Sequence, residues 1–366
     1  MNKVKITNHQ IFSLTACGAF GGVVLVVPSV ITGIAQQDAW ISALITPIYG
    51  LLILKVYCLL GSQYPNMTFV ETVMQIFGKW IGWFIAVSFF TYYSYITTNI
   101  LWNIGNFVTT QVMPETPAFV INAVFAATIV IGLLYGLEVI ARASELFISF
   151  ASFLFILVII FNLPNAKIEN ILPIFEKGIA GCIKGSVFLT DFMPFALFPI
   201  MMIYPAKVND LRAAKKSIYI GYLWSGFLIF ICILMNILVL GTTITSNSLF
   251  PTYWLAKETS IGIIFARFEF IIAAIWITTF FIVIILYFYS AAIGLSQLLG
   301  LKDYRKIVLP LALIILVMVE VNFPDEIYEL NLINLVLLPY DITYALVLPI
   351  ALLIVSWAKK RIFKRK

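Results

Sequence analysis

The sequence predicts an all-α integral membrane protein with about ten transmembrane helices, built as a five-plus-five inverted repeat whose helices 1 and 6 are broken. Of the 366 residues, 62% are hydrophobic and only 11% are charged, whereas soluble domains carry roughly 25% charged residues. The apolar residues form runs that can cross a bilayer, and the basic residues gather in alternate connections between these runs. We therefore expect a single transmembrane domain, residues 1–366, with short basic cytoplasmic tails.

Ten spans are expected, because each apolar run approaches the roughly 20 residues that a membrane helix needs. In chain order they are 10–35, 39–61, 81–107, 118–134, 146–163, 186–204, 217–241, 268–294, 307–321 and 338–357. The ninth is short and is inferred from the need to return the chain across the membrane. Two further helices are expected outside the spans: an amphipathic one within 63–80 at the inner face, ended by Gly78, and a half-buried one in the outer loop 242–265.

The distribution of basic residues sets the predicted orientation. If the N-terminus is cytoplasmic, the outer connections hold only five of the 23 lysines and arginines, namely Lys167, Lys177, Lys184, Lys257 and Arg267. The others then lie on the inner side, as the positive-inside rule requires. An even number of spans also places the C-terminus in the cytoplasm, where its basic tail can attract anionic membrane lipids. The net charge of +6 is thus explained without nucleic-acid binding.

The chain divides near Gly185 into two halves of five spans, about 10–163 and 186–358. An odd number of spans per half makes the second half enter the membrane from the opposite side, which is the geometry of an inverted repeat. Spans one and six are therefore the corresponding first spans of the two halves.

Both of these spans carry residues that interrupt a helix. Span one contains Gly18, Gly21 and Gly22, and each glycine weakens a helix by about 1 kcal/mol relative to alanine. Span six contains Pro194 and Pro199, which each remove an N–H donor and clash with the preceding turn. Paired interruptions in matching spans predict a ligand site near the bilayer midplane. The alternative is that the glycines allow close helix packing and the prolines only kink a packed helix.

Polar residues inside spans are further candidates for the site, because they are costly in a bilayer unless they are used. Asp191 lies in span six beside the break and faces either the cavity or the outer rim. Tyrosines in spans three and eight either line a polar cavity or bond to neighbouring helices. The predicted ligand-binding residues are Gly18, Gly21, Gly22, Tyr95, Asp191, Pro194, Phe195 and Tyr287.

Other ionisable residues in or beside the spans are expected to have structural roles. Arg142 lies three and four residues from Glu145 and Glu138, which suits local helix pairing, with an inner-gate salt bridge as the alternative. Structural positions at the outer boundary or rim are expected for a second set: Arg267, Glu269, Glu320 and Asp341.

No catalytic constellation or cofactor site can be assembled from the sequence. The four cysteines are scattered and form no C-x-x-C pair, and the single histidine, His9, precedes the first span. No nucleotide-binding loop and no Ser/His/Asp arrangement is present. We therefore expect neither an enzyme, nor a metal site, nor a cofactor.

Several short motifs run along nearly the whole chain. They are the glycine-rich first span ending at Pro28, Tyr64-Pro65 followed by Phe77-Gly78-Lys79-Trp80-Ile81-Gly82, the segment from Gly136 and Glu138 to Arg142 and Glu145, Asn170 to Pro173 with Gly178, Arg267-Phe268-Glu269 with Trp276, and Asn322 to Asp325. In this order and at these spacings, the chain resembles the spore germination permease family, the B subunits of nutrient germinant receptors in endospore-forming bacteria.

The resemblance implies the fold of the amino acid–polyamine–organocation superfamily and a place in the spore inner membrane. It implies an A subunit and a lipoprotein C subunit as partners, and a B subunit that senses a small nutrient, often an amino acid. It also places Gly21 at the break of the first span, facing the second half of span six, where Ala196, Leu197 and Pro199 form an apolar lining.

Three functions follow as hypotheses. In the first, a small nutrient such as an amino acid binds between spans one, three, six, eight and ten, and its carboxylate meets free N–H groups around Gly21 and Gly22. Binding then shifts the subunit between two states that signal germination. In the second, the chain is an autonomous amino acid/cation symporter. In the third, it is a membrane scaffold, against which the polar residues inside several spans argue.

Overall fold

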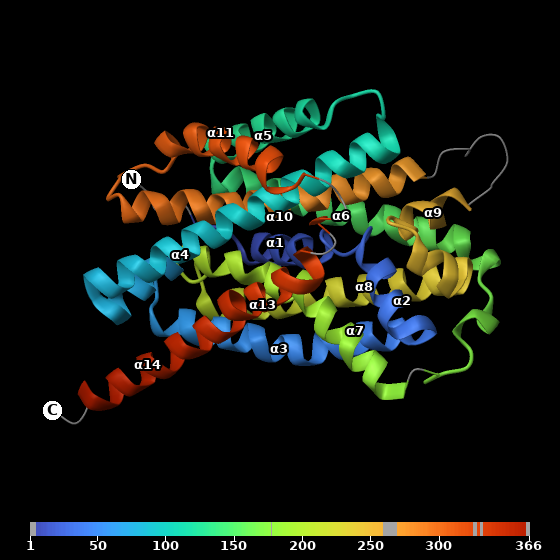
Figure 1. Cartoon of the computed structure of the whole chain (residues 1–366). Helices are drawn as coiled ribbons and strands as arrows, with labels where there is room; N and C mark the ends of the chain where they lie inside the picture. Colours follow the sequence, from blue (N-terminus) through green and yellow to red (C-terminus); the bar gives the residue numbers. More distant parts are fainter. Residues whose placement is uncertain (1–4, 177, 259–268, 325–327, 330–331, 364–366) are drawn as a thin grey trace.

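A computed structural model describes residues 5–176, 178–258, 269–324, 328–329 and 332–363. Long helices run roughly side by side in one bundle, and both ends of the described chain lie at the same end of that bundle (Figure 1). We call this the terminal end and the opposite one the distal end. Among the described residues, eight helical segments are long and apolar enough to cross a membrane, in agreement with the predicted membrane protein.

The regular elements of the first half of the chain are all helices, and the chain alternates between the two ends of the bundle. Its elements are α1 (Asn8–Phe20), α2 (Val27–Ala35), η1 (Gln36–Asp38), α3 (Ala39–Gln63), α4 (Phe69–Phe107), η2 (Val108–Val112), α5 (Ala118–Tyr135), α6 (Leu137–Asn162), η3 (Leu163–Asn165) and η4 (Ile168–Ile171).

The second half begins at the distal end and is helical as well. Its elements are α7 (Gly178–Phe192), η5 (Phe195–Met202), α8 (Leu211–Asn247), α9 (Pro251–Lys257), α10 (Glu269–Leu298), α11 (Arg305–Asn322), η7 (Ile333–Leu337), α13 (Leu338–Asp341), η8 (Ile342–Val347) and α14 (Leu348–Phe363). The short helix α9 is the half-buried helix predicted in the loop between spans seven and eight, and most of its residues are buried.

Local sequence signals explain where helices begin and turn. Thr7 and Thr68 cap α1 and α4 with their side chains. Three residues further on, the side chains of Gln10 and Glu71 accept hydrogen bonds from the backbone N–H groups of the two threonines. Gly78 has a φ of 79°, a conformation that glycine adopts without strain, and it divides α4. The part before Gly78 is the predicted non-spanning helix, at the terminal end, and the part after it is span three.

The predicted breaks are present in both spans. Span one consists of α1 and α2, separated by a turn over residues 21–26, and span six consists of α7 and η5, separated at 193–194. α1 lies near the centre of the bundle in contact with α6, α8 and α10 (Figure 1). The divided helices are therefore surrounded by protein, which is the condition under which a bilayer tolerates interrupted backbone.

Two of the ten predicted spans are not by themselves long, apolar helices. In span one, α1 has only 13 residues because the turn at 21–26 ends it. Span nine is α11, which has 18 residues and carries Arg305, Lys306 and Glu320 close to its ends. Both segments are helical, as predicted.

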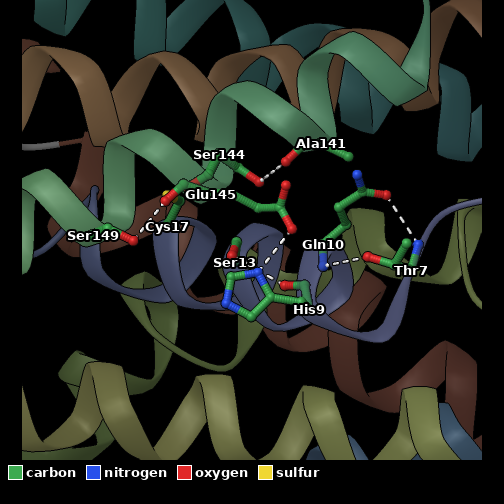
Figure 2. Close-up of polar contacts among 9 residues, drawn as sticks. All are labelled: Thr7, His9, Gln10, Ser13, Cys17, Ala141, Ser144, Glu145 and Ser149. Carbon is green, nitrogen blue, oxygen red and sulfur yellow. Dashed lines mark hydrogen bonds and ion pairs between the residues drawn. The ribbon is translucent and has the colours of Figure 1, made fainter.

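Figure 2 shows how the first half of span one is held at the terminal end. Nδ1 of His9 lies 2.7 Å from Oε1 of Glu145 on α6, and further along α1 the Cys17 thiol donates to the Ser144 carbonyl, 3.7 Å away. Arg142 is bonded to Glu138 at 2.6 Å, which confirms the predicted local pairing. Glu145 thus links α6 to α1 and does not pair with Arg142.

Candidate functional site

A cavity of about 80 Å³ lies between the two helix breaks, α4, α10 and the segment around α13. These elements are spans one, six, three, eight and ten, the segments between which the sequence predicts a site. A water molecule needs about 10–15 Å³ in this measure, so there is room for several waters or one small molecule. The lining residues are Gly22, Val26, Ile96, Asn99, Ile100, Asn103, Asp191, Phe192, Ala196, Trp276, Phe280, Val283, Tyr287, Glu329, Leu337 and Asp341.

The first break brings main-chain donors to this cavity. Gly22 and Val26 both line it, and their N–H groups donate no hydrogen bond to any residue that the structure describes. A β-carbon on Gly22 would lie 3.8 Å from the Phe280 ring, so the space beside this glycine is open cavity. Because a partly buried N–H group without a partner is costly, a ligand that supplies an acceptor here would be stabilised.

The two other glycines of span one serve close packing. A β-carbon on Gly21 would lie 2.8 Å from the backbone carbon and oxygen of Thr279 on α10. One on Gly18 would lie 2.9 Å from the Leu197 side chain of η5. Neither glycine lines the cavity, so both fit the alternative interpretation, in which glycines allow close helix packing. Gly22 is the glycine that faces the cavity.

The second break is stabilised from α10. Oη of Tyr287 donates to the Phe195 carbonyl at 3.5 Å, and Oγ of Ser290 lies 3.4 Å from the Pro199 carbonyl. Pro194 packs towards α3, where its Cβ would lie 3.3 Å from a β-carbon on Gly50. The break therefore positions η5 against α10 and leaves Asp191, three residues before Pro194, in the cavity wall.

Two buried carboxyl groups meet in this wall. Asp191 is 8% exposed and Asp341 is 7% exposed, and their carboxyl groups interact with each other. The Oδ1 atom of each has no hydrogen-bond partner in the part of the chain that is described. Elsewhere in the cavity, Glu329 accepts hydrogen bonds from Asn99 at 3.3 Å and from Asn103 at 3.1 Å. The described lining thus contains three acidic side chains and no basic one.

Aromatic rings pack tightly on one side of the cavity. Phe198 of η5 is fully buried, and its ring centroid lies 5.1–5.8 Å from those of five other rings, which belong to Tyr57, Phe69, Phe89, Tyr92 and Tyr93. We call these six side chains the aromatic layer. Because η5 runs from the cavity towards the terminal end, the aromatic layer lies between the cavity and that end of the bundle.

The predicted ligand-binding residues divide into two groups. Gly22, Asp191 and Tyr287 line the cavity, whereas Phe195 is not part of the lining and contacts it only by accepting the hydrogen bond from Tyr287. Gly18, Gly21 and Pro194 instead pack against neighbouring elements. Tyr95 lies against the rings of Phe323 and Tyr340, with centroids 6.1 and 5.9 Å apart, and is not part of the lining.

The expectation that Asp341 lies at the outer rim is wrong. Helical structure in span ten begins before the predicted start at residue 338, because η7 covers Ile333–Leu337. Asp341 therefore lies roughly 12 Å along the helix from Ile333, at about 1.5 Å per residue, and lines the cavity. Glu320 is exposed near the distal end of α11, as expected, whereas the expected role of Arg267 falls outside the described residues.

Asn103, Trp276 and Glu329 line the cavity but are not among the ligand-binding residues that the sequence predicts. Trp276 is buried in the cavity wall, and its Nε1 has no hydrogen-bond partner among the described residues. Helical spacing was the available signal for two of the three. Asn99 and Asn103 lie four residues apart, and Trp276, Phe280, Val283 and Tyr287 recur at intervals of three and four along one face of α10.

Comparison with known proteins identifies the family. The family model described as spore germination protein, the spore permeases, matches residues 5–326. The chain is 28% identical over 374 residues to spore germination protein KB of Bacillus subtilis (strain 168), covering 100% of this chain and 98% of that protein.

Solved structures with a similar fold are transporters. One is Mhp1, a nucleobase-cation-symport-1 family transporter in a closed conformation with bromovinylhydantoin bound, with a TM-score of 0.67 and 11% identity over 93% of this chain and 76% of that one. Another is MhsT in complex with L-phenylalanine, with a TM-score of 0.63 and 14% identity over 95% and 97%. At such identities the likeness shows the fold alone.

These matches agree with the motifs found in the sequence and with the two broken helices. The matched family is one of germination proteins and not of enzymes. The chain belongs to the spore permease family of spore germination proteins and is a multi-pass membrane protein with a transporter-like fold.

Proposed function

We propose that the chain is the nutrient-binding B subunit of a spore germinant receptor. A small nutrient of the amino-acid class binds in the cavity between the helix breaks, and binding shifts the subunit between two states that start germination. The observation that carries this proposal is the cavity itself, with unpaired N–H donors at Gly22 and Val26 and unpaired carboxyl oxygens at Asp191 and Asp341 within the described chain. The similar fold of MhsT, which is seen with L-phenylalanine, supports an amino acid as the ligand.

The aromatic layer provides a route by which occupancy of the cavity would be transmitted. Ala196 lines the cavity and Phe198, two residues further along η5, packs into the aromatic layer. A ligand that displaces η5 therefore also changes the packing between the cavity and the terminal end. Because packed cores switch between discrete arrangements, a small shift of η5 would be amplified there.

We further propose the membrane setting and the partners. The terminal end faces the cytoplasm, since Lys79, Arg142, Lys215 and Lys302 lie in or beside the helix ends there, and basic residues are concentrated on that side of membranes. The family resemblance supports the spore inner membrane as the location and an A subunit and a C subunit as partners. The matching positions of the two breaks support inverted repeats at about 10–163 and 186–358.

The proposal is tested by filling the cavity in spores. Gly22→Leu would place three carbons beyond Cβ into a space of about 80 Å³, and we expect it to raise the nutrient concentration needed for germination at least tenfold. Gly33→Leu on α2 is the matched control, because a β-carbon there meets nothing within 4 Å. The nutrient is first identified by screening single compounds on a strain that lacks only this gene. A normal response of Gly22→Leu spores at a normal protein level would contradict the proposal.

A second function, autonomous amino acid/cation symport, is favoured by the transporter-like fold and by the acidic lining. It predicts uptake of a labelled amino acid by vesicles that contain the purified chain alone, driven by an imposed proton or sodium gradient. Absence of uptake, together with co-purification of the other two subunits from spore membranes, would support the receptor.

A further inference from the structure

Asp191 and Asp341 form an unusual pair for a bilayer-spanning segment. Each carboxyl group is more than nine-tenths buried, each keeps one oxygen without a hydrogen-bond partner in the described chain, and both residues belong to the lining of one cavity. Two like charges this close in a low-dielectric setting cannot both be ionised without a large cost. One proton shared between the two carboxyl groups would remove that cost.

The surroundings do not supply a positive charge to this pair. Besides Asp191, the ionisable side chains that interact with Asp341 are all tyrosines. They are Tyr57 of α3, Tyr92 and Tyr95 of α4, Tyr287 of α10 and, on its own helix, Tyr340. Glu329 adds another carboxyl group to the cavity. Tyrosine is neutral near pH 7, so no described lysine, arginine or histidine neutralises the pair.

The ligand group that fits is a primary ammonium. It carries three N–H donors on one atom and can bond both carboxyl groups at once. Among the described residues, no group of three His, Cys, Asp or Glu side chains lies close enough together to hold a metal ion.

A second, independent observation concerns the other end of such a ligand. The indole N–H of Trp276 is buried and unpartnered within the described residues, and the N–H groups of Gly22 and Val26 lack partners as well. These donors line the same cavity as the carboxyl pair, so the cavity offers acceptors for a cation and donors for a carboxylate or another acceptor group.

We propose that Asp191 and Asp341 together bind the primary ammonium group of the nutrient, and that binding releases the proton that the two carboxyl groups share in the empty cavity. The ammonium group stays protonated, both carboxyl groups become carboxylates, and the released proton goes to solvent. The inference rests on the proposed function for the role of the nutrient in germination. It concerns which chemical group the cavity selects and how binding depends on pH.

The test uses the full chain purified in detergent and isothermal titration calorimetry. The probes are L-amino acids, taken one at a time, and their 2-hydroxy acid counterparts, such as L-lactate for L-alanine, which lack the ammonium group. We expect an amino acid to bind at least tenfold more tightly than its counterpart. Titrations in buffers of different ionisation enthalpy should show release of up to one proton. The affinity should rise by up to about tenfold per pH unit while the pair holds its proton.

Variants assign this behaviour to the pair. Asp191→Asn and Asp341→Asn should each weaken amino-acid binding roughly 10- to 100-fold and abolish proton release. Asp38→Asn is the matched control, because Asp38 is also buried but lies outside the cavity and accepts a hydrogen bond from the Phe175 N–H at 2.9 Å. Equal binding of amino and hydroxy acids, no binding of any amine, or unchanged proton release in both variants would overturn the proposal.

Infrared difference spectroscopy of the ligand-free chain tests the shared proton without any ligand. The wild type should show the band of a protonated carboxyl group at neutral pH, and each asparagine variant should lose it. The two proposals fail separately. If the Asp variants bind as the wild type while Gly22→Leu spores fail to respond, the ammonium inference falls and the receptor stands. If amine binding releases a proton while Gly22→Leu spores respond normally, the ammonium inference stands and the receptor proposal falls.

Discussion

The two helix breaks differ in the polar groups that they present. The first, at residues 21–26, contains glycine and leaves the N–H groups of Gly22 and Val26 without partners in the described chain. The second is made by Pro194, which has no N–H donor. The carbonyls of Phe195 and Pro199, which follow it, accept hydrogen bonds from Tyr287 and Ser290 of α10. One break therefore offers donors to the cavity, while the other brings it a carboxyl group.

The comparison shows that the residue which interrupts a helix decides what the interruption offers. A break at glycine keeps its backbone N–H groups and, without a β-carbon, allows neighbouring helices to approach closely. A break at proline removes one N–H group, and the backbone carbonyls that remain need hydrogen-bond donors. The half-helices are also held differently. α1 is tied to α6 by the contacts in Figure 2, whereas η5 is held by ring packing in the aromatic layer.

The largest effect is expected where ring packing holds the second break. Phe198→Ala should lower the stability of the purified chain by about 3–5 kcal/mol, because it removes a fully buried ring that contacts five others. Thermal unfolding in detergent measures this. Phe84→Ala on α4, where the ring is 74% exposed, is the control and should change little. Equal losses in the two variants would mean that the aromatic layer does not hold η5.

A smaller effect should separate the adjacent glycines of the first break. Gly21→Ala should destabilise the chain by about 1–3 kcal/mol, because its β-carbon would lie 2.8 Å from the Thr279 backbone, which can move only with α10. Gly22→Ala meets nothing closer than 3.8 Å and should be close to neutral. The same thermal assay compares them, and a reversal of the order would show that Gly22, and not Gly21, is the glycine packed against α10.

The smallest effect is expected at the contact that ties α1 to α6. His9→Ala should cost only about 0.2–1 kcal/mol, since the His9 side chain is 66% exposed, and the loss should shrink at high salt. A more sensitive readout is the rate at which a thiol reagent modifies the buried Cys17, which should rise as α1 loosens. Arg142→Ala removes an ion pair that stays within α6 and should leave that rate unchanged. Equal rates in both variants would remove His9 from the anchoring of α1.

Much of the site's location is readable from composition and from helix-breaking residues. Apolar runs identify membrane spans because bilayer thickness fixes their length, and the glycines and Pro194 mark the breaks because their backbone chemistry is local. For Asp191 the sequence allows both a cavity and a rim position, since a single sequence does not fix the rotation of a helix about its axis. The apolar run of span ten starts at residue 338 and so predicts a rim position for Asp341, whereas helical structure already covers Ile333–Leu337.

The sequence by itself determined that this is a helical membrane protein with interruptions in spans one and six, because span length, charge and backbone freedom are properties of short segments. Only the tertiary structure decided that Gly22 faces the cavity while Gly21 packs against α10, and that Asp341 meets Asp191 from a distant helix. Such pairings depend on how each helix is rotated and shifted against its neighbours. That is set by side-chain packing between distant segments, which no local pattern encodes.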